Sequence, residues 1–111
     1  MSAPTSKVEA ALVPLFAALG DPTRLSLVIK LSSGDDRSIA KLALGTGLSR
    51  QAVTKHLRVL EQAGLIDETR VGRESRFTLV PDRLADAGRY LDEVAAQWEE
   101  ALARIKAHVE S

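Results

Sequence analysis

Apolar positions in the first part of the chain recur at the three- and four-residue spacing of helices. Residues 7–19 show it at Ala11, Leu12, Leu15, Phe16 and Leu19. Pro14 either kinks this helix or starts a shorter one at its first position. After Gly20, Asp21 is a candidate N-cap and Pro22 a candidate first residue for a second helix. That helix is expected to end near Leu31, with a buried stripe of Leu25, Val28, Ile29 and Leu31.

Residues 38–63 have the pattern of two helices joined by a tight turn. Ser38 can cap a short helix, and Ser49 can cap a second one that extends to Ala63. Between them, Gly47 can take the positive φ that such a turn needs. In the second helix Val53, Leu57 and Leu60 share one face, at i, i+4 and i+7. Burying that face turns a polar set outward: Arg50, Gln51, Thr54, Lys55 and Arg58.

Residues 65–80 alternate like two short strands around a turn near Gly72, with Phe77 and Leu79 facing the core. Residues 82–109 then form one long helix without internal proline. The predicted order is ααααββα, a mainly α (α+β) winged helix-turn-helix with a long C-terminal helix. We expect one domain over residues 1–111, with residues 1–6 disordered.

The outward polar face matches the chemistry of a DNA major groove. Its side chains are all hydrogen-bond donors, and base edges offer acceptors. Ser49 at the helix N-terminus favours a phosphate, and Arg70, Arg73 and Arg76 surround the hairpin turn, where arginine suits phosphates and narrow minor grooves. Two simpler interpretations are a solvated amphipathic helix in another all-α protein and an edge hairpin protected by charge against aggregation.

Charge along the chain is uneven although its total is zero. Residues 37–76 hold eight basic and four acidic side chains, whereas residues 77–111 hold four basic and seven acidic ones. This asymmetry is either ordinary scatter of solvated charge or the basis of binding to nucleic acid through the central segment.

The last helix carries an apolar seam at intervals of three and four. Such a seam packs either against a second copy of the chain in a two-fold dimer or back on its own domain. We expect the dimer, with Trp98 as its anchor. The predicted dimer interface consists of Leu15, Leu84, Leu91, Val94, Trp98, Leu102 and Ile105.

Three stretches together resemble the ArsR family of winged-helix regulators: LFAALGDPTRLSLVIKL, SIAKLALGTGLSRQAVTKHLRVLEQAGLI and VGRESRFTLV. The resemblance covers about residues 15–80. It implies that the helix from Arg50 to Ala63 contacts DNA, that the hairpin is a wing, and that the terminal helices build a homodimer. It also implies base-edge contacts by Arg50, Gln51, Thr54 and Lys55, and backbone or wing contacts by Arg58, Arg73 and Arg76.

The chain departs from the metal sensors of that family. It has no cysteine, and its last helix contains a single histidine, His108, whereas zinc needs about four ligands. The resemblance therefore points to the metal-independent members, and we expect no metal and no cofactor. His56, in the candidate recognition helix, is expected to be packed or to touch a phosphate rather than to sense pH.

We therefore predict a homodimeric repressor that binds double-stranded DNA at an inverted-repeat operator, with its own promoter as one candidate site. No nucleophile–base set, phosphate loop or carboxylate pair suggests an enzyme. No apolar run approaches the roughly 20 residues of a membrane span, and the N-terminus is no secretory signal, so we expect a cytoplasmic, nucleoid-associated protein. The alternatives are a version controlled by a small-molecule effector and a winged-helix protein-interaction adaptor that does not bind DNA.

Overall fold

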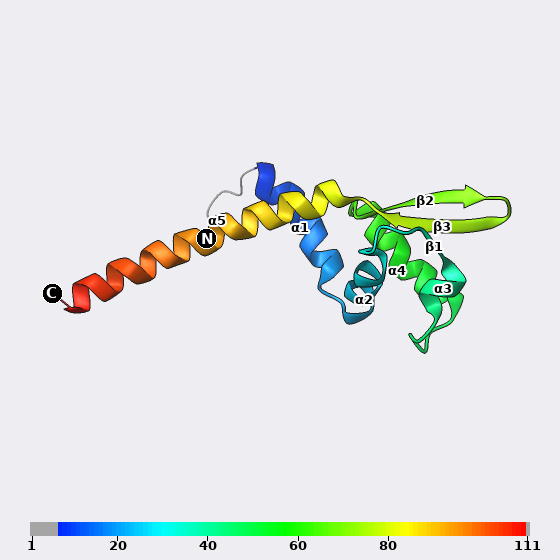
Figure 1. Cartoon of the computed structure of the whole chain (residues 1–111), viewed down its shortest axis with the longest axis horizontal. Coiled ribbons are helices and arrows are strands. Elements are labelled where there is room, and N and C mark those ends of the chain that lie inside the picture. Colours follow the sequence, from blue (N-terminus) through cyan, green and yellow to red (C-terminus); the bar gives the residue numbers. More distant parts are fainter. Residues whose placement is uncertain (1–6, 111) are drawn as a thin grey trace.

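A computed structural model describes residues 7–110, and the expectation for residues 1–6 lies outside that range. Two helices open the chain, α1 (Lys7–Leu19) and α2 (Pro22–Leu31), followed by the two-residue strand β1 (Arg37–Ser38). The helix-turn-helix consists of α3 (Ile39–Ala43) and α4 (Arg50–Gln62). The wing strands β2 (Ile66–Val71) and β3 (Glu74–Leu79) precede the last helix, α5 (Pro81–Glu110) (Figure 1). This winged-helix architecture was predicted from the sequence.

Side-chain caps start three of these helices where the sequence indicates. The carboxylate of Asp21 accepts a hydrogen bond from the Arg24 backbone N–H at 3.0 Å. The hydroxyls of Ser38 and Ser49 accept from backbone N–H groups three residues later, at 3.2 and 3.1 Å. Gly47 has a φ of 73° in the turn between α3 and α4, as expected. Pro14 lies inside α1, which continues across it, so no new helix starts there.

The strands form one antiparallel sheet in the order β1-β3-β2. β1 has only two residues and was not predicted. It pairs with β3 through Arg37 opposite Phe77 and Ser38 opposite Arg76. On the other side of β3, Glu68 of β2 lies opposite the same Phe77. The wing is therefore joined to the start of α3 through the sheet as well as through the chain.

One core, built from α1 to α4, the base of the wing and the start of α5, supports the helix-turn-helix. Phe77 is fully buried and Leu79 packs against the core, as predicted. The prediction of the buried face of α2 is correct for two of its four residues and wrong for the other two. Val28 and Leu31 are buried, but Leu25 and Ile29 are 44% and 63% exposed, and Leu27 occupies the core instead.

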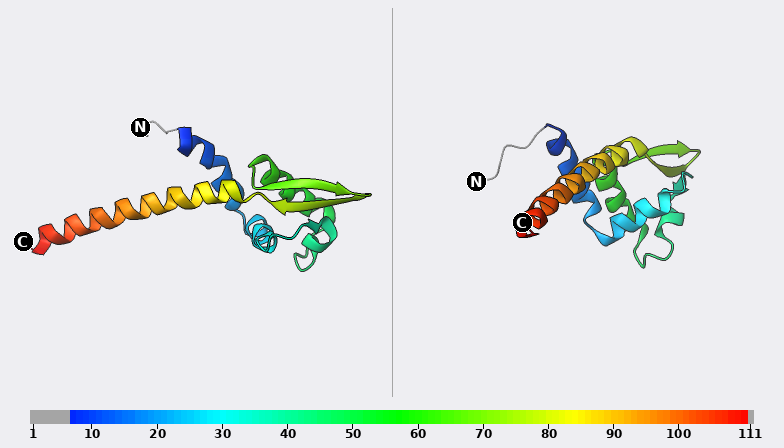
Figure 2. Two further views of the ribbon diagram at one scale, coloured as in Figure 1. Left: turned by 45° about the horizontal axis from the view of Figure 1, so that its top comes forward. Right: turned by 60° about the vertical axis from the view of Figure 1, so that its left-hand side comes forward.

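The long helix α5 leaves the body of the molecule and points away from the wing, which gives the protein dimensions of 67 × 28 × 26 Å (Figures 1 and 2). Only its first turns contact the core, through Leu84, Ala87 and Tyr90. Leu15 of α1 is 0% exposed within the same subunit, so its prediction as a dimer-interface residue is wrong. Leu15 lies on the inner face of α1 and packs in the core of its own subunit.

Within residues 7–110 no single helix is both long and apolar enough to cross a bilayer, although Glu9–Leu19 and Pro22–Leu31 meet the length and composition criteria together, bent by 99°.

Candidate nucleic-acid interface

The recognition-helix candidate α4 is fixed by one apolar face. Val53, Leu57 and Leu60 are fully buried in the core. On the other side of the helix Arg50, Gln51 and Lys55 are exposed and Thr54 is half-buried. The hydroxyl of Thr54 donates to the backbone carbonyl of Arg50 at 2.7 Å, and the hydroxyl of Ser49 accepts in the cap, so each keeps further hydrogen-bonding capacity. The expected row of donors is thus on the surface.

An open groove of about 670 Å³ runs between α4 and the wing. It is lined by the end of β1, the start of α3, the first half of α4 and the wing tip. Its walls are Ser38, Ile39, Ala40, Arg50, Gln51, Thr54, Arg73, Glu74 and Ser75. Arg50 lies on the helix side of this groove and Arg73 on the wing side. A polyanion lying in it would therefore meet cations from both elements.

Four of the predicted DNA-contacting cations have no ion pair with any residue in the described range 7–110. They are exposed on α4 and on the outer part of the wing, and we call them the unpaired cations: Arg50, Lys55, Arg70 and Arg73. No carboxylate of the described residues holds them in an ion pair, although the charge of Arg70 acts on Glu68, so they can attract an anionic partner.

The other two predicted cations, Arg58 and Arg76, are held by acids of the protein itself. Arg58 contacts Glu61 and Glu68, each at 3.0 Å. Arg76 contacts the carboxylate of Asp36 at 3.2 Å and that of Glu74 at 3.1 Å. Successive residues of a strand point to opposite faces, so Arg76 faces away from the side on which Phe77 meets the core. The sequence contains these acids, but nothing in its spacing indicates which cation each one contacts.

Known proteins resemble this chain in both sequence and fold. A family model described as a helix-turn-helix domain matches residues 19–69. The chain is 39% identical over 79 residues to the HTH-type transcriptional regulator CmtR of Mycobacterium tuberculosis, covering 71% of this chain and 66%, just under two thirds, of that protein. It is 30% identical to the arsenical resistance operon repressor of Escherichia coli over 81 residues, covering 73% of this chain and 69% of that one. A solved ArsR-like transcriptional regulator from a Rhodococcus species matches with a TM-score of 0.74 at 39% identity, over 87% of this chain and 91% of that one.

The chain belongs to the ArsR family of helix-turn-helix transcriptional regulators. This membership confirms two predictions made from the sequence, that the protein is a DNA-binding regulator and that it is not an enzyme. In this ArsR-family chain α4 is the second helix of the helix-turn-helix, and β2 and β3 form the wing.

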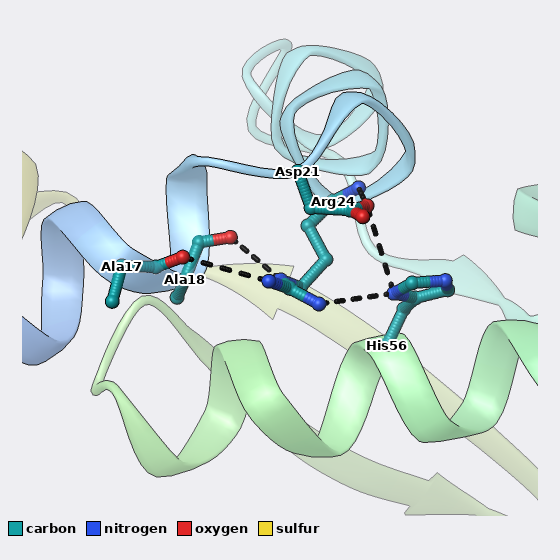
Figure 3. A network of polar contacts seen from close by, with 5 residues as sticks. All are labelled: Ala17, Ala18, Asp21, Arg24 and His56. Carbon is teal, nitrogen blue, oxygen red and sulfur yellow. Dashed lines mark hydrogen bonds and ion pairs between the residues drawn. The ribbon is translucent and has the colours of Figure 1, made fainter.

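Arg24, which sequence reasoning did not identify as a site residue, ties α4 to the helices before it (Figure 3). Its Nε donates to the carbonyl of Ala18 at 2.7 Å, at the end of α1. Its Nη1 lies 3.3 Å from Nδ1 of His56 in α4. The signal for this role was the GDPTR stretch of the family resemblance.

Asp21 completes this network, because its carboxylate lies 3.8 Å from the same Nδ1. The backbone hydrogen bond from Arg24, supported by the charges of Arg24 and His56, holds the pKa of Asp21 below its usual range. His56 is half-buried and partnered within the protein, which agrees with the expectation of a packed histidine. The network fixes how α4 sits against α1 and α2.

Proposed function

We propose that this protein is a homodimeric repressor that binds an inverted-repeat operator, with its own promoter as the first candidate. One observation supports this most directly: Arg50, Gln51 and Thr54 line the α4 side of the groove, and Arg73 faces them from the wing side. A repressor of this kind acts by occupying DNA that the polymerase needs.

The two sides of the groove suit different parts of the DNA. Side chains of α4 carry the donors that distinguish base edges, and we assign base contacts to Arg50, Gln51, Thr54 and Lys55. Arg70 and Arg73 on the wing suit the phosphate backbone or the adjacent minor groove. The hydroxyl of Ser49, at the N-terminus of α4, suits a phosphate.

A second copy of the chain is the occupant we propose for the exposed seam of α5. The helix has 30 residues, a length of about 45 Å, and only its beginning packs on its own core. Beyond that point Leu91, Trp98, Leu102 and Ile105 are exposed and Val94 is half-buried. This uncovered seam favours a dimer over the alternative of a helix folded back on its own domain. An antiparallel partner helix covers the same positions on both subunits.

Dimerisation gives the recognition helices a fixed spacing. Two copies of α4 related by a two-fold axis match two half-sites about one helical turn apart, or a multiple of that distance. A single subunit offers only half of the contacts. We therefore expect an inverted repeat rather than an isolated half-site to be the preferred DNA.

We also propose that DNA binding does not depend on a metal ion. The sequence contains no cysteine, and no group of three or more metal-binding side chains occurs within residues 7–110. Independence from metal needs a direct test, because one relative is named as an arsenical resistance operon repressor. Thermal melts with and without Zn²⁺ decide it, because a zinc-dependent protein would gain several degrees with the metal.

A candidate position for a small-molecule effector is an open cleft of about 500 Å³ between α1 and α5. Ala11 and Leu12 form its apolar wall, and Arg83, Asp86, Arg89, Tyr90 and Glu93 supply polar groups. Burial, followed by the charge of Glu9, raises the pKa of Tyr90, which keeps its hydroxyl protonated. Both the size and the mixed lining suit a small organic ligand.

The deciding experiment compares Gln51→Ala with Arg73→Ala on a duplex enriched from a random library by the wild-type chain. We expect Gln51→Ala to lose about ten- to a hundredfold on the enriched duplex and little on random DNA. Arg73→Ala should weaken binding to both DNAs alike. Enrichment of no duplex at all would favour a winged-helix adaptor that contacts proteins instead. Equal losses on both DNAs for both variants would contradict the assigned roles.

A further inference from the structure

Arg58 joins the recognition helix to the wing through a two-point contact. Its Nη1 and Nη2 donate to the two carboxylate oxygens of Glu68 on β2, at 3.0 and 3.3 Å. The same Nη1 donates to Glu61, one turn along α4, at 3.0 Å. Paired N–H donors on one carboxylate fix the angle between the groups as well as their distance.

The wing side of this contact involves both of its strands. Glu68 lies opposite Phe77 in the β2–β3 register, and directly opposed residues share one face of a sheet. The guanidinium of Arg58 lies over the Phe77 ring, 5.8 Å from its centre. A hydrogen bond from Arg58, and a second one from Ser75, lower the pKa of Glu68. Ser75 in turn lines the groove, so the contact reaches the groove wall.

The charge around Arg58 makes it a poor phosphate ligand. Two carboxylates surround one guanidinium, which leaves the cluster with a net charge of −1 when both acids are ionised. Three of its N–H bonds are already used within the protein, out of the five that an arginine carries. A phosphate that approached Arg58 would have to displace Glu68 or accept its repulsion.

We propose that Arg58 is a positioning residue, which holds the wing at a fixed angle to α4 and so sets the width of the groove between Arg50 and Arg73. This role replaces the phosphate contact that the sequence suggested for Arg58, and it rests on the proposed DNA binding. Without the tie, the wing pivots at its base and the cations on the two sides of the groove no longer engage one DNA segment together.

Two matched variants test this role. Glu68→Gln is expected to change DNA affinity in opposite directions under the two hypotheses, and Glu61→Gln is the control for the lost charge. Each removes one negative charge next to Arg58, but only Glu68 connects α4 to the wing. If Arg58 positions the wing, Glu68→Gln weakens binding to the enriched duplex by about three- to tenfold, whereas Glu61→Gln leaves it unchanged or slightly tighter. If Arg58 contacts a phosphate, both variants free its charge and both tighten binding.

Arg58→Lys and Arg58→Gln supply the second measurement. Lysine keeps the charge but loses the two-point geometry, so positioning predicts that Arg58→Lys weakens binding as Glu68→Gln does. The salt dependence of Arg58→Gln binding should match the wild type, because no counterion-releasing contact is lost. A phosphate contact would instead reduce the slope of log K against log salt by about 1.8 for a dimer.

These outcomes separate this inference from the function on which it rests. Circular dichroism melts establish that each variant is folded at the assay temperature. Tighter binding by Glu68→Gln, wild-type affinity of Arg58→Lys, or a reduced salt slope for Arg58→Gln would overturn the positioning role alone. Failure of the wild-type chain to enrich any duplex would overturn DNA binding itself.

Discussion

Truncation of Trp98 to alanine should dissociate the proposed dimer. Trp98 lies in the middle of the α5 seam and is 64% exposed in the isolated subunit. It is the only tryptophan of the chain. A large aromatic surface left in water at the centre of an apolar seam is the group that gains most when a second copy covers it.

The expected loss can be worked out from its exposure. A buried aromatic side chain covers about 150–250 Å², so an exposure of 64% leaves about 100–160 Å² for the partner to cover. At about 25 cal/mol per Å² this area corresponds to about 2.5–4 kcal/mol for each subunit. Incomplete coverage, and the area that alanine retains, reduce this to about 2 kcal/mol. The two tryptophans of a dimer then contribute about 4 kcal/mol, or about a thousandfold in the dimer Kd.

Sedimentation equilibrium of the wild type, Trp98→Ala and Glu100→Ala measures this effect. Glu100 follows Trp98 by about 200° around the helix, so its truncation removes a side chain from the opposite face. Glu100→Ala should leave the dimer Kd unchanged. In the wild type, dilution should shift the fluorescence emission of Trp98 to longer wavelength as the dimer dissociates. A Trp98→Ala dimer Kd within about threefold of the wild type would refute the seam as the interface.

Three further predictions concern salt, capping and pH. The two wing cations of each subunit that suit phosphates, Arg70 and Arg73, would make four contacts in a dimer, which gives a log–log salt slope of about −3.6 and a loss of about a hundredfold between about 50 and 200 mM salt. A flat titration by fluorescence anisotropy would contradict this. Ser38→Ala removes the cap of α3 and should lower the free energy of unfolding in urea by about 1 kcal/mol, whereas Ser33→Ala in the exposed turn should change little. The hydrogen bond from Arg58 is the main cause that lowers the pKa of Glu68 from its ordinary value of 4.5. The ionised Glu68 carboxylate therefore stabilises the fold above pH 4.5, and this stabilisation is lost as the pH falls through the lower pKa of the folded state. Urea titrations from about pH 6 to about pH 3 should therefore show a shallower decline for Glu68→Gln, and identical profiles would count against the ion pair.

Local sequence signals were enough to predict the elements that hold the recognition helix. Serine caps, a glycine with positive φ and an i, i+4, i+7 apolar set all depend on residues close together in the chain. For that reason α4 and its buried face could be predicted. The strand β1 could not, because two residues carry no periodicity and become a strand only by pairing with β3, about 40 residues away.

The assignment of apolar residues to particular surfaces was less reliable. In α2 the spacing allows two overlapping stripes, and contacts with other elements select Leu27 rather than Leu25 and Ile29 for the core. Leu15 was predicted to lie at a dimer interface, but it is fully buried in the core of its own subunit. An apolar residue does not reveal whether it faces its own core or a partner, since both environments exclude water in the same way.

Ion pairing divides the cations of the central segment into two groups with different effects. Arg58 and Arg76 lie near the base of the wing, and each is neutralised by two acids. The unpaired cations lie on the exposed face of α4 and the outer part of the wing. Two of the unpaired cations, Arg50 and Arg73, line the groove, whereas the two paired arginines are held by carboxylates of the protein itself. The net charge of the central segment counts paired and unpaired cations alike. It therefore does not show which cations are available to an anionic partner and which are already held by acids of the protein.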